Sequence, residues 1–470
     1  MEASQKATAL WRNFFKLSMP QMRAFHMSWF AFFLCFFAWF GIAPLMAVVR
    51  DEFGLTKDQI GWSIIASVAI TILARLFIGW FCDRVGPRIA YTSLLIVGSI
   101  PVMSIGLAYD ANSFVFFRLL IGIIGASFVI TQYHTTVMFA PNVVGTANAT
   151  SAGWGNLGGG VTQLVMPALY AFLLTTMGFS TSASWRLSMY LAGLVCLLTG
   201  VAYFILTQDT PEGNLKELRQ AGKLEGKAKS NGVFKAAFTD YRAWALFVAY
   251  GACFGIELTV NNVAALYFVD NFSYFQSLSP LEAMKTAGLI AGLFGLTNLF
   301  ARTLGGASGD LFGVRWGLKG RVLLLFMVLF CEGIALMIFS QMHTLVQAIP
   351  ALLVFSLFVQ MSEGATFSVV PFVNRRAIGG VSGIVGAGGN AGAVLAGFLF
   401  KSSIAWPTCM LIMGGLVVLS SFCVFAVSFS SDAEQDARRE LATAMARKRQ
   451  DDPSDSAESE RESTPELQPA

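Results

Sequence analysis

The chain has 470 residues, of which 55% are hydrophobic and only 13% are charged. Soluble globular proteins carry about 25% charged residues, and much of their surface must face water. This composition excludes a soluble enzyme and a nucleic-acid-binding protein, and the net charge of +4 is too small to indicate an anionic macromolecular partner.

Apolar runs of about 20 residues can cross a bilayer as helices, and the chain contains twelve of them. The first six cover residues 27–49, 60–81, 89–108, 113–138, 144–172 and 186–207. The second six cover residues 243–269, 286–308, 321–340, 346–372, 378–401 and 406–429. The first run lacks the small-residue exit of a cleavable signal peptide. We therefore expect an all-α integral membrane protein.

The distribution of polar residues divides this chain into five parts. They are an N-terminal tail (1–26), a six-helix bundle (27–207), a linker (208–242), a second six-helix bundle (243–430) and a C-terminal tail (431–470). The C-terminal tail is rich in Ser, Glu, Asp and Pro, so we expect it to be largely disordered.

The positions of the basic residues predict the orientation. Of the 32 Lys and Arg residues, 24 fall in the two tails, the linker and the loops on the same side, whereas five fall in the outside loops and helix ends. Cytoplasmic loops carry an excess of Lys and Arg. Both termini and the linker are therefore expected in the cytoplasm, in a multi-pass protein of the cytoplasmic membrane.

Residues with catalytic or metal-binding chemistry are scattered. The seven cysteines form no close-spaced pair, and the three histidines are far apart. This pattern fits neither a disulfide framework nor a metal site. The spans hold no nucleophile–base pair either. We expect no catalytic residues, no metal and no cofactor.

An internal repeat divides the chain into two related halves. The pattern R-x3-G-x3-D-x2-G-x-R occurs at Arg75, Gly79, Asp83, Gly86 and Arg88, and again 227 residues later at Arg302, Gly306, Asp310, Gly313 and Arg315. A second echo relates Gly155-Asn156 to Gly389-Asn390. Transporters built from such repeats bind substrate near the midplane, between the halves.

The two repeated arginines point to an anion. An arginine inside a membrane costs at least about 2.5–3.5 kcal/mol, yet Arg75 and Arg302 lie at matched depth, one in each half. A planar guanidinium can donate paired hydrogen bonds to a planar oxyanion. Alternatively, each arginine pairs with an acid or with helix carbonyls. Asn156 and Asn390 offer amide donors, although close helix packing alone accounts for most of the surrounding glycines.

The same residues resemble a known family. The loop from Gly79 to Arg88 is similar to the loop motif of the major facilitator superfamily, and residues 152–160 and 386–393 resemble the two nitrate-motif segments of its nitrate/nitrite porters. The resemblance covers about residues 25 to 430. It implies a major-facilitator-type fold, with twelve transmembrane helices in two pseudo-symmetric six-helix bundles, and transport of nitrate or nitrite by alternating access.

The resemblance also implies roles for individual residues. Phe128 and Tyr250 align with aromatics that flank the anion, and Gly155 and Gly389 lie in the nitrate-motif segments. The loop charges are interpreted as an interdomain latch that controls the inward-closed state; they are Asp83, Arg84, Arg88, Asp310 and Arg315.

Three acids lie within spans: Glu257, Glu332 and Glu363. Glu257 shares a helical face with Tyr250, Phe254 and Asn261. Burial favours the neutral form of a carboxyl group, so Glu257 is a candidate proton carrier. Two arginines alone favour exchange of one anion for another, whereas an ionisable Glu257 permits symport. The family contains both types, and we favour proton-coupled uptake.

Several other roles stay open. His134 is a second candidate for proton coupling, although a hydrogen-bonded packing role competes with it. Arg118 serves either proton coupling or helix anchoring, and Glu332 and Glu363 are candidate partners of the arginines.

Other functions compete with nitrate uptake. They are nitrate/nitrite antiport, transport of organic phosphates or carboxylates, and non-transporting nitrate sensing. We expect a functional monomer surrounded by membrane lipid.

Overall fold

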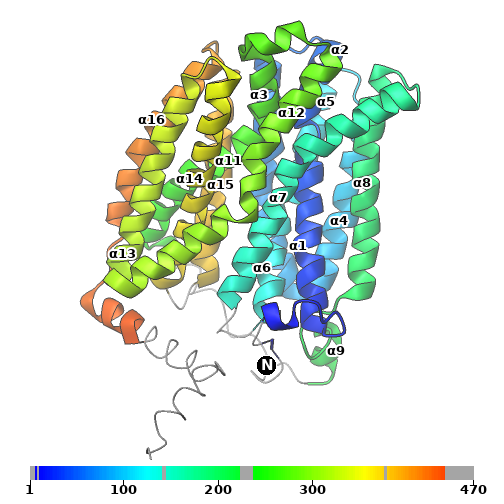
Figure 1. Cartoon of the computed structure of the whole chain (residues 1–470). Helices are drawn as coiled ribbons and strands as arrows, with labels where there is room; N and C mark the ends of the chain where they lie inside the picture. The colour runs from blue at the N-terminus through cyan, green and yellow to red at the C-terminus, as the bar shows by residue number, and fades with distance from the viewer. Residues whose placement is uncertain (1–5, 8–9, 140–143, 223–236, 375–377, 440–470) are drawn as a thin grey trace, which may run out of the picture.

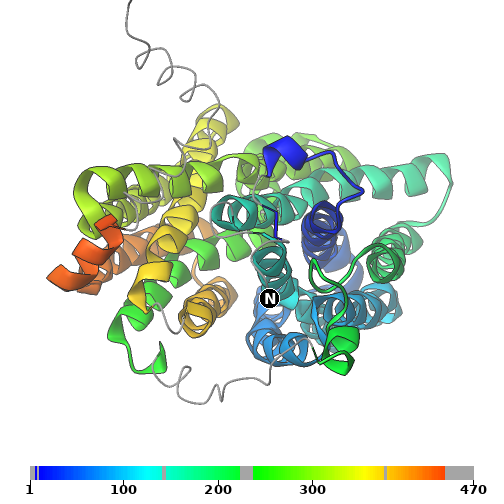
Figure 2. The same cartoon turned by 90° about the horizontal axis from the view of Figure 1, so that it is seen from below.

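The computed structural model of the chain describes residues 6–7, 10–139, 144–222, 237–374 and 378–439. Within them, twelve helical stretches are long and apolar enough to cross a membrane. They form two groups that lie side by side in both Figure 1 and Figure 2. The predicted all-helical fold with twelve spans is thereby confirmed.

The first group holds the N-terminal six spans. The first span is α1 (Pro20–Trp39), which continues through η3 (Ala43–Leu45) into α2 (Met46–Phe53). The second and third spans are α3 (Lys57–Val85) and α4 (Pro87–Ser104) with η4 (Ile105–Leu107), and the fourth consists of α5 (Ala111–Ile121), η5 (Gly122–Ala126) and α6 (Ser127–Met138). The fifth and sixth spans are α7 (Val144–Ala171) with η6 (Phe172–Thr176), and α8 (Thr181–Leu206). A short helix precedes them, η2 (Trp11–Asn13), and another follows in the linker, α9 (Leu215–Gln220).

The second group holds the C-terminal six spans. Its helices are α11 (Tyr241–Asn271), η7 (Ser273–Ser277), α12 (Pro280–Leu296), η8 (Thr297–Leu299), α13 (Ala301–Ser340), α14 (Leu345–Val373), α15 (Ile378–Lys401) and α16 (Trp406–Phe422) with η9 (Cys423–Ala426). The eighth span runs through α12 and η8 into the start of α13, and the ninth follows within α13.

Local capping explains where several helices begin. The Thr56 side chain accepts a hydrogen bond from the Gln59 amide, Asp110 does the same for Ser113, and Ser279 for Glu282. Each pair forms a reciprocal capping box. Ser279 places the start of α12 at Pro280, six residues before the predicted start of the eighth span. α1 likewise begins early, at Pro20, because proline fits the first turn of a helix.

The repeated loop motif folds differently in the two halves. In the first half the chain turns at Gly86, which has φ 90° and separates α3 from α4. The equivalent Gly313 does not turn. The chain instead turns one helical turn later, at Gly317, with φ 69° and ψ −154°. Gly86 and Gly317 both adopt backbone angles that residues with a side chain disfavour. The predicted loop between residues 308 and 321 is therefore helical except at this kink.

Apolar side chains cover the outside of the bundle. Leu73, Val97, Ile205, Leu395 and Leu419 are 60–70% exposed. In water such a surface is unfavourable, whereas lipid tails solvate it. These side chains therefore mark the lipid-facing belt of both bundles.

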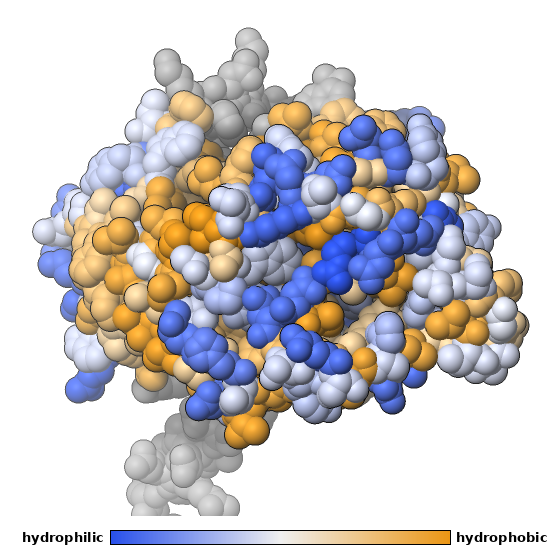
Figure 3. Space-filling view, turned by 90° about the horizontal axis from the view of Figure 1, so that it is seen from above, coloured by the Kyte–Doolittle hydropathy of each residue, from blue (hydrophilic) through white to orange (hydrophobic). Residues whose placement is uncertain are grey.

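The most extensive contacts between the halves are made by two helix pairs, α3 with α15 and α7 with α12. The N-terminus and α9 lie at one end of the molecule, which we call the terminal face, and α2 lies at the opposite face (Figure 1). Hydrophilic residues gather across the middle of the opposite face (Figure 3).

Two ion pairs join the halves near the opposite face. Arg50 contacts Asp270 at 2.8 Å, and Lys401 contacts Asp58 at 2.8 Å. These pairs help to hold the two bundles together at the opposite face.

Candidate anion-binding site

Arg75 of α3 is a buried cation at the boundary between the halves. Its side chain is 8% exposed. It donates hydrogen bonds to the carbonyl oxygens of Gly386 at 3.1 Å and Gly125 at 3.4 Å. Among the described residues, Nη2 has no hydrogen-bond partner and no carboxylate pairs with this guanidinium. A buried charge without a counter-ion is costly, which favours the binding of an anion.

Arg302 of α13 is the repeat-related cation, and it is also buried. Its Nη2 donates to the Tyr250 hydroxyl at 2.8 Å, and its Nη1 lies 2.7 Å from Glu363 Oε2. Arg75 and Arg302 are close enough to repel each other. The repeat therefore brings two like charges together, one with an acid partner and one without.

An aromatic wall connects the two arginines. The ring centroid of Phe254 lies 5.6 Å from Cζ of Arg75 and 6.0 Å from Cζ of Arg302. Phe128 lies 5.5 Å from Arg75, and Tyr250 stacks on Phe254 at 5.1 Å. Such contacts stabilise a cation through the ring face. The predicted aromatics Phe128 and Tyr250 thus both lie beside an arginine.

Phe367 of α14 closes this wall between the halves. Its ring contacts Phe128 at 6.3 Å and Tyr250 at 5.1 Å. Sequence reasoning missed this contact, because nothing in the sequence distinguishes Phe367 among 42 phenylalanines. The role of Phe254 was also missed, although its spacing of four residues from Tyr250 was a usable signal.

Gly155 and Gly389 make room for equivalent rings. A Cβ added at Gly155 would lie 1.7 Å from Cδ1 of Phe32, and one at Gly389 would lie 2.3 Å from Cδ1 of Phe254. Real Cβ atoms do not approach so closely. The two glycines therefore position the aromatic rings of α1 and α11, and Phe254 in turn lies beside both arginines.

The paired asparagines are buried but differ in their contacts. Asn156 Nδ2 lies 3.5 Å from Glu257 Oε2. Neither side-chain amide atom of Asn390 has a hydrogen-bond partner among the described residues. Buried polar atoms are normally paired. Asn390 therefore offers an unused donor close in sequence to Gly386, the residue that Arg75 contacts.

Glu257 is fully buried on α11. Its Oε1 accepts a hydrogen bond from Asn298 Nδ2 at 2.8 Å, and the long contact from Asn156 reaches its other oxygen. Glu257 also lies within the electrostatic range of Arg302 and of Glu363. The acid predicted for proton coupling thus lies beside the arginine pair, and Asn298 is a neighbour that sequence reasoning missed.

His134 lies in a separate polar cluster. Its Nε2 is 2.8 Å from the Gln208 carbonyl oxygen, and its Nδ1 is 2.6 Å from the Tyr203 hydroxyl. A neutral imidazole satisfies both contacts, with Nε2 donating and Nδ1 accepting. These partners favour the packing role, because they fix the ring between α6, α8 and the start of the linker.

Arg118 bridges the halves. Its Nη1 donates to the Trp39 carbonyl oxygen at 3.2 Å, and its Nη2 donates to Asn262 Oδ1 at 2.5 Å. Asn262 lies on α11, so Arg118 anchors the fourth span to the second half. Its contacts support the anchoring interpretation.

The predicted latch is described only in part. The side chains of Asp83, Arg84 and Asp310 lie outside the described part of the structure. Arg88 donates to the Phe204 carbonyl oxygen, and Arg315 lies over the ring of its neighbour Trp316. Both contacts stay within one half, so an interdomain role for these charges stays a prediction.

A linker residue that sequence reasoning missed supports the first loop motif. Asp209 accepts hydrogen bonds from the backbone amides of Arg88 and Leu215, both at 2.9 Å. Its carboxylate thereby caps the first turns of α4 and α9. Through these two hydrogen bonds, the Asp209 side chain connects the linker to the turn between α3 and α4.

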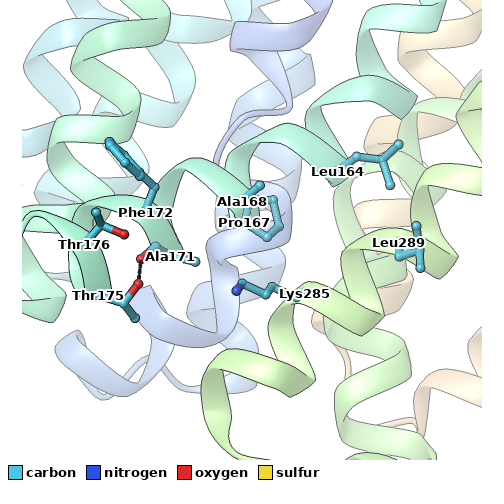
Figure 4. Close-up of a pocket in the computed structure, with 9 residues that line it drawn as sticks. All are labelled: Leu164, Pro167, Ala168, Ala171, Phe172, Thr175, Thr176, Lys285 and Leu289. Atoms are coloured by element: carbon cyan, nitrogen blue, oxygen red, sulfur yellow. Dashed lines mark hydrogen bonds between the residues drawn. The ribbon is translucent and has the colours of Figure 1, made fainter.

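A separate hollow of about 560 Å³ lies between α7 and α12 (Figure 4). Apolar side chains and Thr175, Thr176 and Lys285 line it. Neither arginine of the central pair contributes to it. The hollow is therefore distinct from the candidate anion-binding site.

Comparison with known proteins identifies the family of the chain. Residues 28–373 match the Major Facilitator Superfamily. The "High affinity nitrate transporter 2.5" of Arabidopsis thaliana is 39% identical over 435 residues, which cover 91% of this chain and 84% of that protein. The "Nitrate/nitrite transporter NrtP" of Nostoc punctiforme is 30% identical, with 87% of this chain and 91% of that protein covered.

Solved structures support the fold. A bacterial homolog of the human lysosomal transporter Spinster, inward-facing and occupied, matches with a TM-score of 0.64 and 16% identity, over 89% of this chain and 97% of that chain. The nucleoside transporter NupG matches with a TM-score of 0.61 and 14% identity, over 86% and 99%. The chain therefore belongs to the Major Facilitator Superfamily of membrane transporters, within the family of the nitrate transporters to which it is similar.

Proposed function

We propose that this chain is a secondary active transporter that moves nitrate and/or nitrite across the cytoplasmic membrane by alternating access. The named activities of its relatives support this substrate class. The chain works as a monomer in lipid, with both termini in the cytoplasm, in agreement with the distribution of Lys and Arg.

The observation that carries the proposal is the unpaired charge of Arg75 beside Arg302. A small planar anion offers several oxygens, so it can accept hydrogen bonds from both guanidinium groups at once. Phe254 lies beside both groups. The proposed site consists of Arg75, Arg302, Asn156, Asn390, Phe128, Tyr250, Gly155 and Gly389.

The acids beside this site favour coupling to protons. Glu257 lies among buried groups near Arg302, where a carboxyl group can bind and release a proton as its surroundings change. A site with two arginines and no acid would be left with a charge of +2 after releasing its anion, which favours exchange. Glu257 reduces that charge and allows the empty carrier to return.

The walls of the site disfavour larger anions. Phe254 lies beside both arginines, and Phe367 contacts Tyr250, the hydrogen-bond partner of Arg302. An organic phosphate or carboxylate needs more hydrogen-bond donors than these aromatic side chains offer. Nitrate/nitrite exchange remains the second candidate function, because it needs only the two arginines.

Uptake by the purified full-length chain in liposomes tests this proposal. We expect labelled nitrate or nitrite to accumulate when the outside is more acidic than the inside, and to accumulate less without the gradient. Uptake that depends only on internal nitrite or nitrate would indicate exchange. Absence of transport and exchange of both anions by folded protein would contradict the proposal.

A further inference from the structure

Arg302 already holds an anion, and that anion belongs to the protein. Nη1 of Arg302 lies 2.7 Å from Oε2 of Glu363, and both side chains are buried, at 5% and 0% exposed. A carboxylate presents planar oxygens to a guanidinium much as nitrate does. Glu363 and nitrate therefore compete for the same donor atoms. Arg75 has no such internal competitor among the described residues.

Glu363 is surrounded by groups that restrict its charge. From α11 it faces Glu257, Tyr250 and Cys253, and from α13 it faces Arg302 and Glu332. Arg302 is the cation in this group, against three acids. Once nitrate occupies Arg302, an ionised Glu363 would be left buried beside two further carboxyl groups. Such an arrangement strongly favours a proton on one of them.

The contacts of Glu257 and Glu363 indicate which of these acids takes that proton. Asn298 Nδ2 donates a hydrogen bond to Glu257 Oε1 at 2.8 Å, and this bond favours the charged form of Glu257. Glu363 Oε2 lies 2.7 Å from Arg302 Nη1, and among the described residues neither oxygen of Glu363 has a hydrogen-bond partner. When nitrate displaces Glu363 from Arg302, the proton is therefore better held on Glu363.

We propose that Glu363 is a tethered competitor of the substrate on Arg302, and that its protonation upon displacement couples one proton to each nitrate. Nitrate replaces the Glu363 carboxylate on Arg302, and one proton taken up from the solvent forms an O–H bond on Glu363. One negative and one positive charge enter, so the charge of the site is unchanged. Release reverses both steps, and Glu363 returns to Arg302.

This inference rests on the proposed nitrate transport and assigns the coupling to a second acid. Glu257, whose charged form is favoured by the hydrogen bond from Asn298, lowers the charge of the site, whereas Glu363 is the group whose charge changes with occupancy. The two roles differ in a measurable way. Loss of the Glu257 charge leaves the number of protons taken up per nitrate unchanged, whereas loss of the Glu363 carboxyl group abolishes that uptake.

Proton uptake during nitrate binding tests the assignment. In weakly buffered detergent solution, we expect the wild-type chain to take up about one proton per nitrate bound, with apparent affinity rising by up to about tenfold per pH unit of acidification. Glu257→Gln should retain this uptake. Glu363→Gln should bind nitrate without proton uptake, with affinity independent of pH.

Liposome assays provide the second measurement. Glu363→Gln should keep nitrate–nitrate exchange and lose accumulation driven by a pH gradient. Glu332→Gln, which removes a buried acid of α13 that forms no ion pair with Arg302, should keep both. Gradient-driven accumulation at the wild-type level in Glu363→Gln, or nitrate binding to the wild type without proton uptake, would overturn the assignment. Failure of the wild type to bind or exchange nitrate would instead contradict the proposed function.

Discussion

Arg75 donates a hydrogen bond across the boundary between the halves, to the carbonyl oxygen of Gly386 at 3.1 Å. The donor lies on α3 and the acceptor on α15, two helices that pack against each other between the bundles. The cation proposed to bind substrate is therefore also an interdomain contact. Movement of the bundles relative to each other changes the surroundings of Arg75, which links anion binding to alternating access.

The geometry of Arg75 should matter as well as its charge. Arg75→Lys keeps the positive charge but loses the planar fork that donates to Gly386 and to an anion together. We expect nitrate affinity to fall by about tenfold or more, as for loss of one charge-assisted hydrogen bond. Affinity measured by equilibrium binding checks this. The exposed Arg12→Lys serves as the control, and equal affinity for both variants would contradict the role of the fork.

The close contacts of Gly155 and Gly389 should make both positions intolerant of a side chain. Gly389→Ala places a Cβ against the Phe254 ring, and overpacking of this kind costs about 1–3 kcal/mol. We expect a lower midpoint of thermal unfolding and reduced uptake. Gly383→Ala on the same helix meets no atom within 4 Å and should behave as wild type.

The overlap between a Cβ added at Gly155 and the Phe32 ring can be relieved by removing that ring. We expect Phe32→Ala combined with Gly155→Ala to lose less stability than the two single changes added together, because contacting residues are energetically coupled. Thermal unfolding of the four proteins gives the coupling. Simple additivity would show that the Phe32 ring is not the obstacle.

The ion pairs near the opposite face should favour the conformation described here. Asp58→Asn with Asp270→Asn removes both interdomain pairs, and exposed pairs contribute about 0.2–1 kcal/mol each. We expect the equilibrium between the closed and open states of that face to shift a few-fold toward the open state. Spin labels at Phe179 and Tyr274, in a background without native cysteines, should report longer distances. Asp51→Asn, whose pair with Arg50 stays within one half, should leave the distances unchanged.

Asp209 should stabilise the linker and the first loop motif together. Asp209→Ala removes acceptors for two helix N-termini, each worth about 1 kcal/mol. We expect a lower midpoint of thermal unfolding, with Asp209→Asn intermediate because its amide retains one oxygen acceptor. The exposed Asp432→Ala is the control. An unchanged midpoint in Asp209→Ala would show that other contacts hold these helix ends.

The fold could be predicted from the sequence because membrane spans are continuous apolar runs. The two arginines of the candidate site could be predicted because the repeat aligns Arg75 with Arg302. The turn at Gly317 could not, since the equivalent position of the first half holds Ala90 and not a glycine. The approach of Phe254 to both arginines also depends on how α11 packs against α3 and α13.

The partner of Arg302 was only narrowed to two candidates by the sequence. Glu332 and Glu363 are both acids within spans, and composition treats them alike. The choice of Glu363 depends on the rotation of α14 about its axis, which packing with α11 and α13 determines. The sequence thus identifies the residues that can form an ion pair between helices, but it does not predict which of them are in contact.

The central claim is that Arg75 and Arg302 bind one nitrate together. The most direct measurement is a nitrate binding isotherm for the full-length chain, with Arg75→Gln and Arg302→Gln as variants. We predict one nitrate per chain and a loss of affinity of about tenfold to hundredfold in each variant, since each removes charge-assisted hydrogen bonds. Wild-type affinity in either folded variant, or two nitrates bound per chain, would contradict the claim.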